Sequence, residues 1–200
     1  MLFNSSYRGN GRHDDITIVS GLPRSGTSMM MRMIEAGGVE VVTDNVRKAD
    51  IDNPRGYYEL EKVKKIKEDC SWLKDCRNKA FKMVSELLYH LPDYEEYKIL
   101  FMLRNMDEML ASQRKMLERL GKQGSDVSKD KMKVLYEKHL MKLKRWLREQ
   151  KNMDVLFLYY GGVVANPMEN AKKVDGFLGG RLNIERMSNV VEKALYRQRI

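Results

Sequence analysis

The feature that most restricts the fold of this chain is a glycine-bracketed loop between an apolar run and a methionine-rich stretch. Ile16-Thr-Ile-Val-Ser20 is short and rich in β-branched residues, which predicts a buried strand. Gly21 and Gly26 then enclose four residues. Thr27 to Glu35 is followed by Gly37-Gly38, which predicts a helix with a glycine stop. A strand, a tight loop and a helix in this order predict the opening of a parallel α/β sheet.

The rest of the chain repeats this alternation. Further strands are expected at residues 39–43, 79–84, 98–103 and 155–160, and a loop at 44–56. Helices are expected at 59–76, 85–91, 105–120, 128–150, 167–178 and 184–195. The pattern predicts three layers, with a mostly parallel central sheet flanked by helices and right-handed crossovers. In such folds, ligands bind beyond the carboxyl ends of the strands.

Length and composition predict one soluble domain over residues 1–200, with a flexible polar N-terminus at 1–13. No apolar run approaches the ~20 residues that span a bilayer, and the N-terminus lacks the apolar core of a signal peptide. A cytoplasmic location is therefore expected. Cys70 and Cys76 are expected to be free thiols.

The net charge of +9 favours an anionic partner. Two basic runs, at residues 62–67 and 138–148, have the pattern of solvated outer faces of helices. The chain shows no nucleic-acid-binding motif, and its aromatic residues are not interleaved with the basic runs. Charge alone does not choose among nucleic acid, an acidic membrane surface and a polyanionic small molecule. No nucleic-acid partner and no membrane span are expected.

The loop between Gly21 and Gly26 has the chemistry of a phosphate cradle. The glycines allow the backbone to approach an anion closely, and successive amides at a helix N-terminus attract negative charge. Arg24 adds a planar guanidinium that suits phosphate or sulfate oxygens. Hydroxyl donors are also available from Ser25, Thr27 and Ser28.

The spacing is that of a nucleoside-triphosphate loop, G-x-x-x-x-G-K-S/T, but Thr27 stands where that motif has lysine. Without that lysine, ordinary ATP or GTP hydrolysis loses its main cation. Arg24 can supply the charge from inside the loop. A glycine-rich turn that binds nothing is the ordinary structural alternative.

The stretch Pro23-Arg-Ser-Gly-Thr-Ser28 resembles the 5′-phosphosulfate loop of sulfotransferases that use 3′-phosphoadenosine-5′-phosphosulfate (PAPS), and especially the form in tyrosylprotein and some bacterial sulfotransferases. The resemblance implies a P-loop NTPase-like fold, PAPS as donor and 3′-phosphoadenosine-5′-phosphate (PAP) as product. It also implies cofactor-binding roles for Pro23, Arg24, Ser25, Gly26, Thr27 and Ser28.

A second motif supports the resemblance. In sulfotransferases, an arginine that ends a strand and a serine eight residues later hold the 3′-phosphate, and Arg104 and Ser112 have this spacing. The ordinary alternative for Arg104 is an ion pair with Asp107 or Glu108. The resemblance extends more weakly to the helix that ends near Leu178.

The chain also departs from the family. Cytosolic sulfotransferases carry Lys-Thr-His where Lys82-Met83-Val84 stands, so the general-base histidine is missing, although Lys82 could stabilise charge. Their late Arg-Lys-Gly loop has no clear counterpart; Arg197 and Arg199 are the nearest candidates.

Three other residues are therefore candidates for the general base. Asp44 lies at the spacing of the tyrosylprotein sulfotransferase glutamate, Glu59 follows two tyrosines, and His90 is the third candidate. The ordinary alternatives are a turn or cap for Asp44 and an N-terminal helix position for Glu59.

The expected activity is transfer of a sulfuryl group from PAPS to a hydroxyl or amine of a small-molecule, carbohydrate or peptide acceptor, without a metal. Tyr57, Tyr58, Trp72 and the methionines of residues 29–33 could line the acceptor pocket, although the methionines fit core packing better. One alternative is a P-loop nucleotide or small-molecule kinase, which would need a lysine on the phosphates and an aspartate for Mg²⁺. The other is a non-catalytic polyanion- or nucleotide-binding protein.

Overall fold

A single five-stranded sheet forms the centre of the fold. The computed structural model describes residues 14–44, 46, 49, 50, 53, 55–121 and 128–196. All the strand pairs are parallel, and the strand order is β2-β3-β1-β4-β5. The strands are β1 (Ile16–Gly21), β2 (Glu40–Val41), β3 (Lys79–Val84), β4 (Tyr97–Leu103) and β5 (Met153–Tyr159). The expected α/β fold with a parallel sheet is confirmed.

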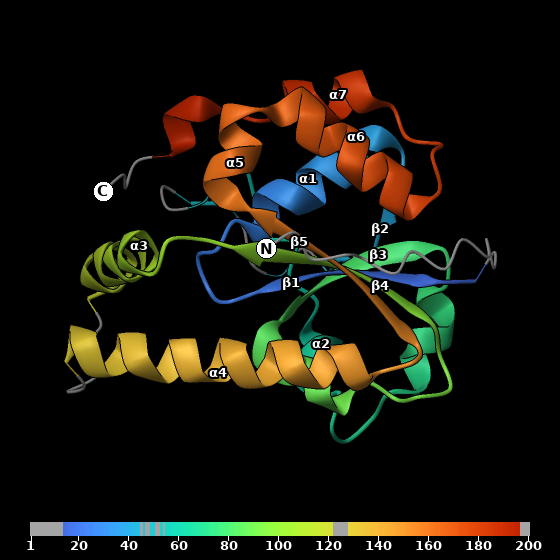
Figure 1. The fold of residues 1–200 in the computed structure, drawn as a ribbon, viewed down its shortest axis with the longest axis horizontal. Helices are drawn as coiled ribbons and strands as arrows, with labels where there is room; N and C mark the ends of the chain where they lie inside the picture. The colour runs from blue at the N-terminus through green and yellow to red at the C-terminus, as the bar shows by residue number, and fades with distance from the viewer. Residues whose placement is uncertain are drawn as a thin grey trace.

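Helices cover both faces of this sheet, as Figure 1 shows. One face carries α1 (Thr27–Gly37), α5 (Tyr160–Ala165), α6 (Pro167–Leu178) and α7 (Ile184–Asn189). The other face carries α2 (Glu61–Lys64) and α4 (Lys129–Glu149), whereas α3 (Met106–Arg119) lies at one end of the sheet. Three 3₁₀ helices complete the described elements: η1 (Ser71–Cys76), η2 (Ser85–His90) and η3 (Lys193–Leu195).

The core is divided by the sheet because successive strand residues point to opposite faces. Ile16 and Ile18 of β1 pack toward α4, whereas Val19 packs toward α1. Three methionines of α1, Met30, Met31 and Met33, are fully buried on that second side. The expectation that these methionines pack in the core is confirmed.

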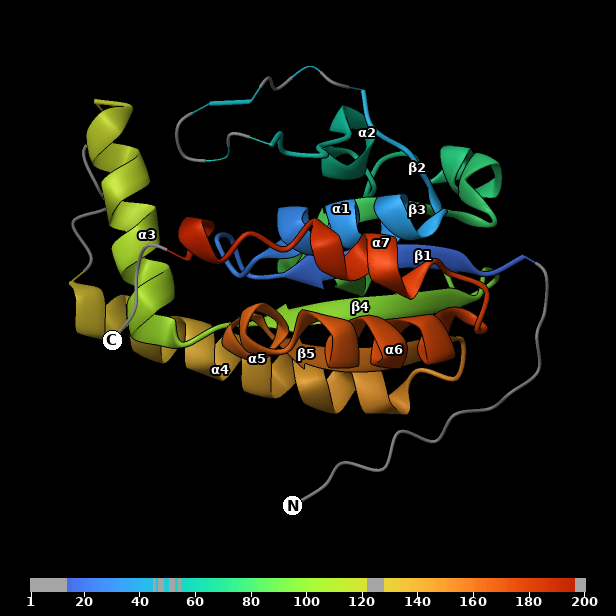
Figure 2. The ribbon, with the colours of Figure 1, turned by 90° about the horizontal axis from the view of Figure 1, so that it is seen from above.

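The register of the sheet brings the two predicted phosphate motifs to one edge. Gly21 at the end of β1 lies opposite Val84 of β3 and Met102 of β4. The loops that follow β1 and β4 therefore leave neighbouring strands at their carboxyl ends, where parallel α/β sheets bind ligands. Figure 2 shows α3 standing beside this edge.

Two expected elements are wrong. Residues 59–76 form no continuous helix: α2 ends at Lys64, and η1 begins at Ser71. The buried residues Leu60, Val63 and Ile66 follow a spacing of three, and the Asp69 carboxylate accepts the amide hydrogen of Ser71, which starts the 3₁₀ turn anew.

The expected last helix is also shorter, with α7 ending at Asn189 and η3 following at Lys193. Conversely, α5 begins at Tyr160, where the pair Gly161-Gly162 gave no helix signal.

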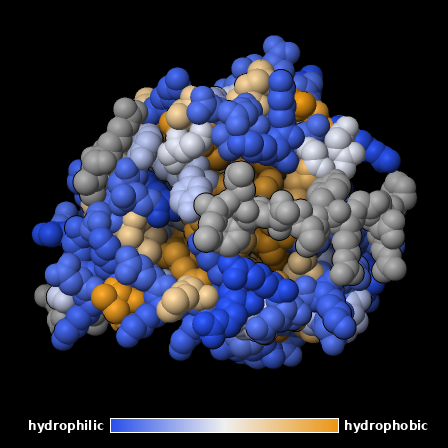
Figure 3. Space-filling model, in the orientation of Figure 1, coloured by the Kyte–Doolittle hydropathy of each residue, from blue (hydrophilic) through white to orange (hydrophobic). Residues whose placement is uncertain are grey.

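The outer face of α4 is solvated, as its charge run predicts. Lys138, Lys142, Arg145 and Arg148 are exposed, and Figure 3 shows hydrophilic surface with small apolar spots along this helix at the lower left. In the part of the chain that the structure describes, no helix is both long and apolar enough to cross a bilayer.

Candidate active site

The loop after β1 adopts a backbone that depends on its glycines. Gly21, Arg24 and Gly26 have positive φ values of 153°, 68° and 102°. A Cβ atom at Gly21 would lie 2.6 Å from the Met102 carbonyl oxygen, and one at Gly26 would lie 2.4 Å from the Tyr160 ring. The loop therefore packs against β4 and α5 in a way that side chains at these glycines would block.

The N-terminus of α1 is open to an anion. Gly26 is its N-cap, no side chain caps it, and its first turn carries no acidic residue. The Ser25 hydroxyl is buried and has no hydrogen-bond partner among the described residues. Unsatisfied amides and a buried unpaired hydroxyl beside a helix N-terminus fit a phosphate or sulfate group.

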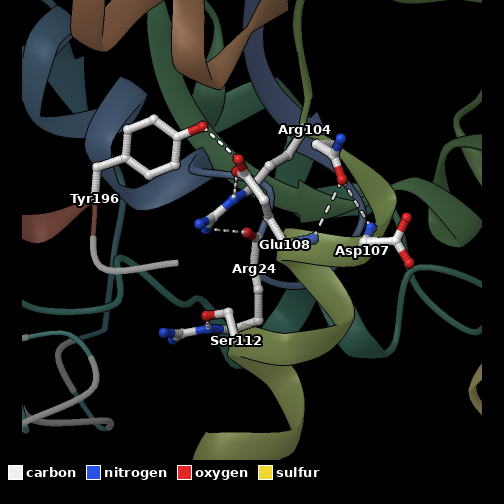
Figure 4. Close-up of polar contacts among 7 residues, drawn as sticks. Arg24, Arg104, Asp107, Glu108, Ser112 and Tyr196 are labelled. Carbon is white, nitrogen blue, oxygen red and sulfur yellow. Dashed lines mark hydrogen bonds and ion pairs between the residues drawn. The ribbon is translucent and has the colours of Figure 1, made fainter. Parts of the chain in front are cut away.

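The two motifs predicted from sequence meet at this loop. The Arg24 Nε donates a hydrogen bond of 3.0 Å to the Ser112 Oγ of α3. The Arg104 Nη1 donates one of 3.2 Å to the Arg24 carbonyl oxygen, and Figure 4 shows the three residues in one cluster. The loop and the Arg/Ser pair thus belong to one site.

Arg104 also forms the ion pair that the sequence offered as an alternative. Its Nε lies 3.2 Å from the Glu108 Oε2, and the two side chains are only 8% and 5% exposed. The Tyr196 hydroxyl donates a 2.7 Å hydrogen bond to the other Glu108 oxygen. The guanidinium also lies over the Tyr160 ring, 4.6 Å from its centroid. Arg104 is therefore held by the Glu108 carboxylate, the Tyr160 ring and the Arg24 carbonyl oxygen.

The remaining residues of α3 near this cluster have structural partners. Asn105 caps the helix, since its side chain accepts the amide hydrogens of Asp107 and Glu108. Asp107 pairs with Lys133 at 2.6 Å and with Lys129 at 2.9 Å. Of the two expected ion-pair partners of Arg104, the structure therefore gives Glu108.

A pocket of about 350 Å³ opens over the loop. The residues predicted to bind the cofactor that line it are Pro23, Arg24, Gly26, Thr27, Ser28, Arg104 and Ser112. Ser25 is buried and is not among the described lining residues. Lys82 also lines the pocket and donates to the Tyr57 carbonyl oxygen, which accepts the Ser28 hydroxyl as well.

The base candidates are placed differently. Glu59 lines the pocket, whereas Asp44 and His90 are not among its described lining residues. The Asp44 carboxylate accepts the amide hydrogens of Glu61 at 2.6 Å and Val46 at 3.0 Å. These bonds lower the pKa of Asp44, which is the behaviour of a cap at the start of α2. The structure thus matches the capping alternative for Asp44.

Sequence reasoning missed several lining residues and misplaced others. Tyr57 and Met29 line the pocket as expected, but Trp72 packs on Phe81 in the core and Tyr58 donates to Glu35. The missed residues include Arg32, Leu60, Val63, Lys115, Met116, Arg119, Tyr160 and Glu192.

Helical periodicity could have found three of the missed residues, because 115, 116 and 119 share the α3 face of Ser112. Arg197 and Arg199 lie outside the described residues. Among the described residues, no group of three or more His, Cys, Asp or Glu could hold a metal ion.

Comparison with known families decides what this arrangement is. The family model described as the sulfotransferase domain matches residues 14–198, which is most of the chain. The chain belongs to the sulfotransferase domain family. A search of curated protein sequences gave no match to this member.

Solved structures show the fold of this sulfotransferase-family chain. Mouse sulfotransferase SULT7A1, complexed with PAP, superposes with a TM-score of 0.55 at 17% identity, over 90% of this chain and 63% of that one. The sulfotransferase domain of the curacin biosynthetic pathway gives a TM-score of 0.53 at 12% identity, over 94% and 93% of the two chains.

A third structure, the sulfotransferase domain of the Synechococcus PCC 7002 olefin synthase, gives a TM-score of 0.52 at 14% identity, over 94% of this chain and 82% of that one. The chain thus spans less than two thirds of the mouse enzyme but most of the two biosynthetic domains.

Proposed function

We propose that this chain transfers a sulfuryl group from PAPS to an acceptor hydroxyl or amine and releases PAP. The observation that carries the proposal is the contact between the phosphate loop and the Arg/Ser pair through Arg24, Ser112 and Arg104. The contact places an anion cradle and a second cationic group in one pocket, as a nucleotide phosphorylated at two positions requires. Family membership supports the same chemistry.

Each end of the donor has its own residues in this proposal. The amides at the start of α1, the Ser25 hydroxyl and Arg24 hold the 5′-phosphosulfate, because they form an open anion site. Arg104 and Ser112 hold the 3′-phosphate. Lys82 lies on the pocket wall and stabilises charge on the leaving phosphate. When bound, PAPS supplies the activated sulfuryl group.

Glu59 is the proposed general base. Its placement in the pocket wall, which Lys82 also lines, lets a carboxylate take the acceptor proton near the cationic part of the site. Asp44 has both oxygens engaged by backbone amides and is absent from the described lining. His90 is exposed at the end of η2 and is likewise absent from it.

Calorimetry with PAP and with ATP–Mg²⁺ tests the donor class. We expect the protein to bind PAP in the presence of EDTA and to prefer it to ATP–Mg²⁺ by at least about tenfold, because the site has two phosphate clusters and lacks the P-loop lysine. A preference for ATP–Mg²⁺ that disappears on removal of Mg²⁺ would instead support the kinase alternative.

Substitution of the two carboxylates separates the base from the cap. Glu59→Gln is expected to lower the rate of sulfuryl transfer by about 100-fold or more without changing PAP affinity, since a general base contributes that much. Asp44→Asn is expected to keep the rate within about threefold of the unmodified protein, as befits a surface cap. Radiolabelled transfer and calorimetry give the two readouts, and the opposite ranking would assign the base to Asp44.

The finer parts of the expectation stay predictions. In this proposal, transfer from PAPS needs no metal. The acceptor is a small molecule, a carbohydrate or a peptide. The single domain over residues 1–200 and the cytoplasmic location also remain expectations from the sequence.

A further inference from the structure

A buried carboxylate lies beside the proposed 3′-phosphate site. The Glu108 side chain is only 5% exposed, and its Oε2 lies 3.2 Å from the Arg104 Nε. A carboxylate and a phosphate bind the guanidinium fork in the same bidentate way, so the two anions compete for one arginine. The geometry of Glu108 therefore decides how Arg104 is presented to the pocket that it lines.

The Tyr196 hydroxyl occupies one of the two Glu108 oxygens. It donates a 2.7 Å hydrogen bond to Oε1, whereas Arg104 donates to Oε2 (Figure 4). Partial burial, and then this bond, raise the pKa of Tyr196, so the hydroxyl keeps its proton and acts as the donor at neutral pH. In the described contacts, each carboxylate oxygen thus has its own donor.

The ring of Tyr196 lies beside the same arginine. Its centroid is 5.4 Å from the central carbon of the Arg104 guanidinium. The ring also meets the Tyr160 ring edge to face, with 5.0 Å between the centroids. One side chain therefore contacts both members of the ion pair, Glu108 through the hydroxyl and Arg104 through the ring.

The segment of residues 190–196 has a second polar anchor. The Glu192 carboxylate, four residues before Tyr196, accepts hydrogen bonds of 3.2 Å from the Arg32 Nη1 of α1 and 2.8 Å from the Arg55 Nε. This anchor and the ring contacts do not depend on the Tyr196 hydroxyl. Removal of that hydroxyl therefore tests its own contribution and leaves the segment in place.

We propose that Tyr196 is a positioning residue for the 3′-phosphate of the donor and that it acts on Arg104 through Glu108. The proposal rests on the sulfotransferase function above, in which Arg104 binds that phosphate. By holding Oε1, the hydroxyl keeps the carboxylate from taking the guanidinium with both oxygens. Without the hydroxyl, Oε1 loses its donor and turns to the N–H groups of the adjacent guanidinium, and the carboxylate then competes with the phosphate.

A matched pair of nucleotides tests this role. Adenosine 5′-phosphate (AMP) is PAP without the 3′-phosphate, so the ratio of the two affinities measures recognition of that group. In calorimetry, Tyr196→Phe is expected to bind PAP about tenfold more weakly and AMP within about twofold of the unmodified protein. A merely structural role would weaken both ligands alike. Equal losses for PAP and AMP, or an unchanged PAP affinity, would overturn the proposal.

A control variant checks that the effect belongs to this hydroxyl. Tyr58→Phe also removes a hydroxyl that donates to a glutamate, Glu35, but Tyr58 is not among the described residues that line the pocket. We expect this control to leave the ratio of PAP to AMP affinity within about twofold of its normal value. A tenfold fall in the control would refute the assignment to Tyr196.

A double variant tests whether Tyr196 acts through the arginine. Addition of Tyr196→Phe to Arg104→Ala is expected to change PAP affinity by no more than about twofold, because the group that the hydroxyl positions is already absent. A further tenfold loss in this background would show that Tyr196 acts independently of Arg104, and the proposed route through Glu108 would fail.

The unmodified protein separates this inference from the proposed function. If it binds PAP no more tightly than AMP, the 3′-phosphate site is contradicted, and both proposals fail with it. If it prefers PAP by about tenfold or more and Tyr196→Phe keeps that preference, only the role of Tyr196 is refuted.

Discussion

Replacement of Arg104 by alanine is expected to lower PAP affinity by about 100-fold or more and the free energy of unfolding by about 3 kcal/mol. The two losses have different causes. Arg104 is the cation next to the predicted 3′-phosphate site, and charge-assisted hydrogen bonds to phosphate are among the strong ones. It is also the buried partner of Glu108, so its removal leaves an uncompensated carboxylate whose side chain is only 5% exposed.

A double variant separates these causes. Arg104→Ala/Glu108→Ala removes the unpaired carboxylate together with the arginine, so we expect more than half of the lost unfolding free energy to return. The contact of the guanidinium with the Tyr160 ring is still lost, which keeps recovery incomplete. PAP affinity should stay low in the double variant, because the phosphate ligand is still absent.

Denaturant unfolding gives the free energy of unfolding, and calorimetry on the same preparations gives the PAP affinity. Normal PAP binding by the double variant would show that Arg104 has a structural role alone, and the 3′-phosphate assignment would then fail. A single variant as stable as the unmodified protein would show that Glu108 is relieved by another group, with the Tyr196 hydroxyl as its nearest partner.

The sequence allowed the phosphate loop to be predicted because its signals are local. The glycines, the apolar run before them and the helix after them all lie within residues 16–38. Arg104 and Ser112 could also be found, since a strand end and a helix face fix their spacing. The Glu108–Tyr196 contact joins residues that are 88 apart in the sequence, so no local pattern predicts it.

The helix expected at residues 59–76 is wrong because tertiary packing, like the Glu108–Tyr196 contact, cannot be seen in a local pattern. Its apolar residues were compatible with a helix, but packing against the core selected a shorter spacing with separate turns. The choice between the candidates for the general base also depends on tertiary structure. Asp44 is a candidate by its spacing from the loop and Glu59 by its place after two tyrosines. Only the folded chain shows that Asp44 binds backbone amides while Glu59 lines the pocket.

Replacement of Gly26 by alanine is expected to be far more damaging than the same change at Gly38, although the two glycines have nearly the same backbone. Gly26 has φ 102° and ψ 15°, and Gly38 has φ 109° and ψ 8°. An alanine in this left-handed conformation costs about 1 kcal/mol at either position. Gly38 has open space around its missing Cβ, whereas at Gly26 that atom would lie 2.4 Å from the Tyr160 ring.

The difference in unfolding free energy between the two variants therefore measures the cost of the contact between a Cβ atom at position 26 and the Tyr160 ring. We expect Gly38→Ala to lose about 1 kcal/mol of unfolding free energy and to keep its PAP affinity. Gly26→Ala should lose a further 1–3 kcal/mol, roughly the cost of overpacking, and bind PAP at least about tenfold more weakly because the loop amides shift. Equal stability losses would mean that the ring moves freely. Since Tyr160 also lies against Arg104, that result would weaken the view that one packed cluster holds both phosphate sites.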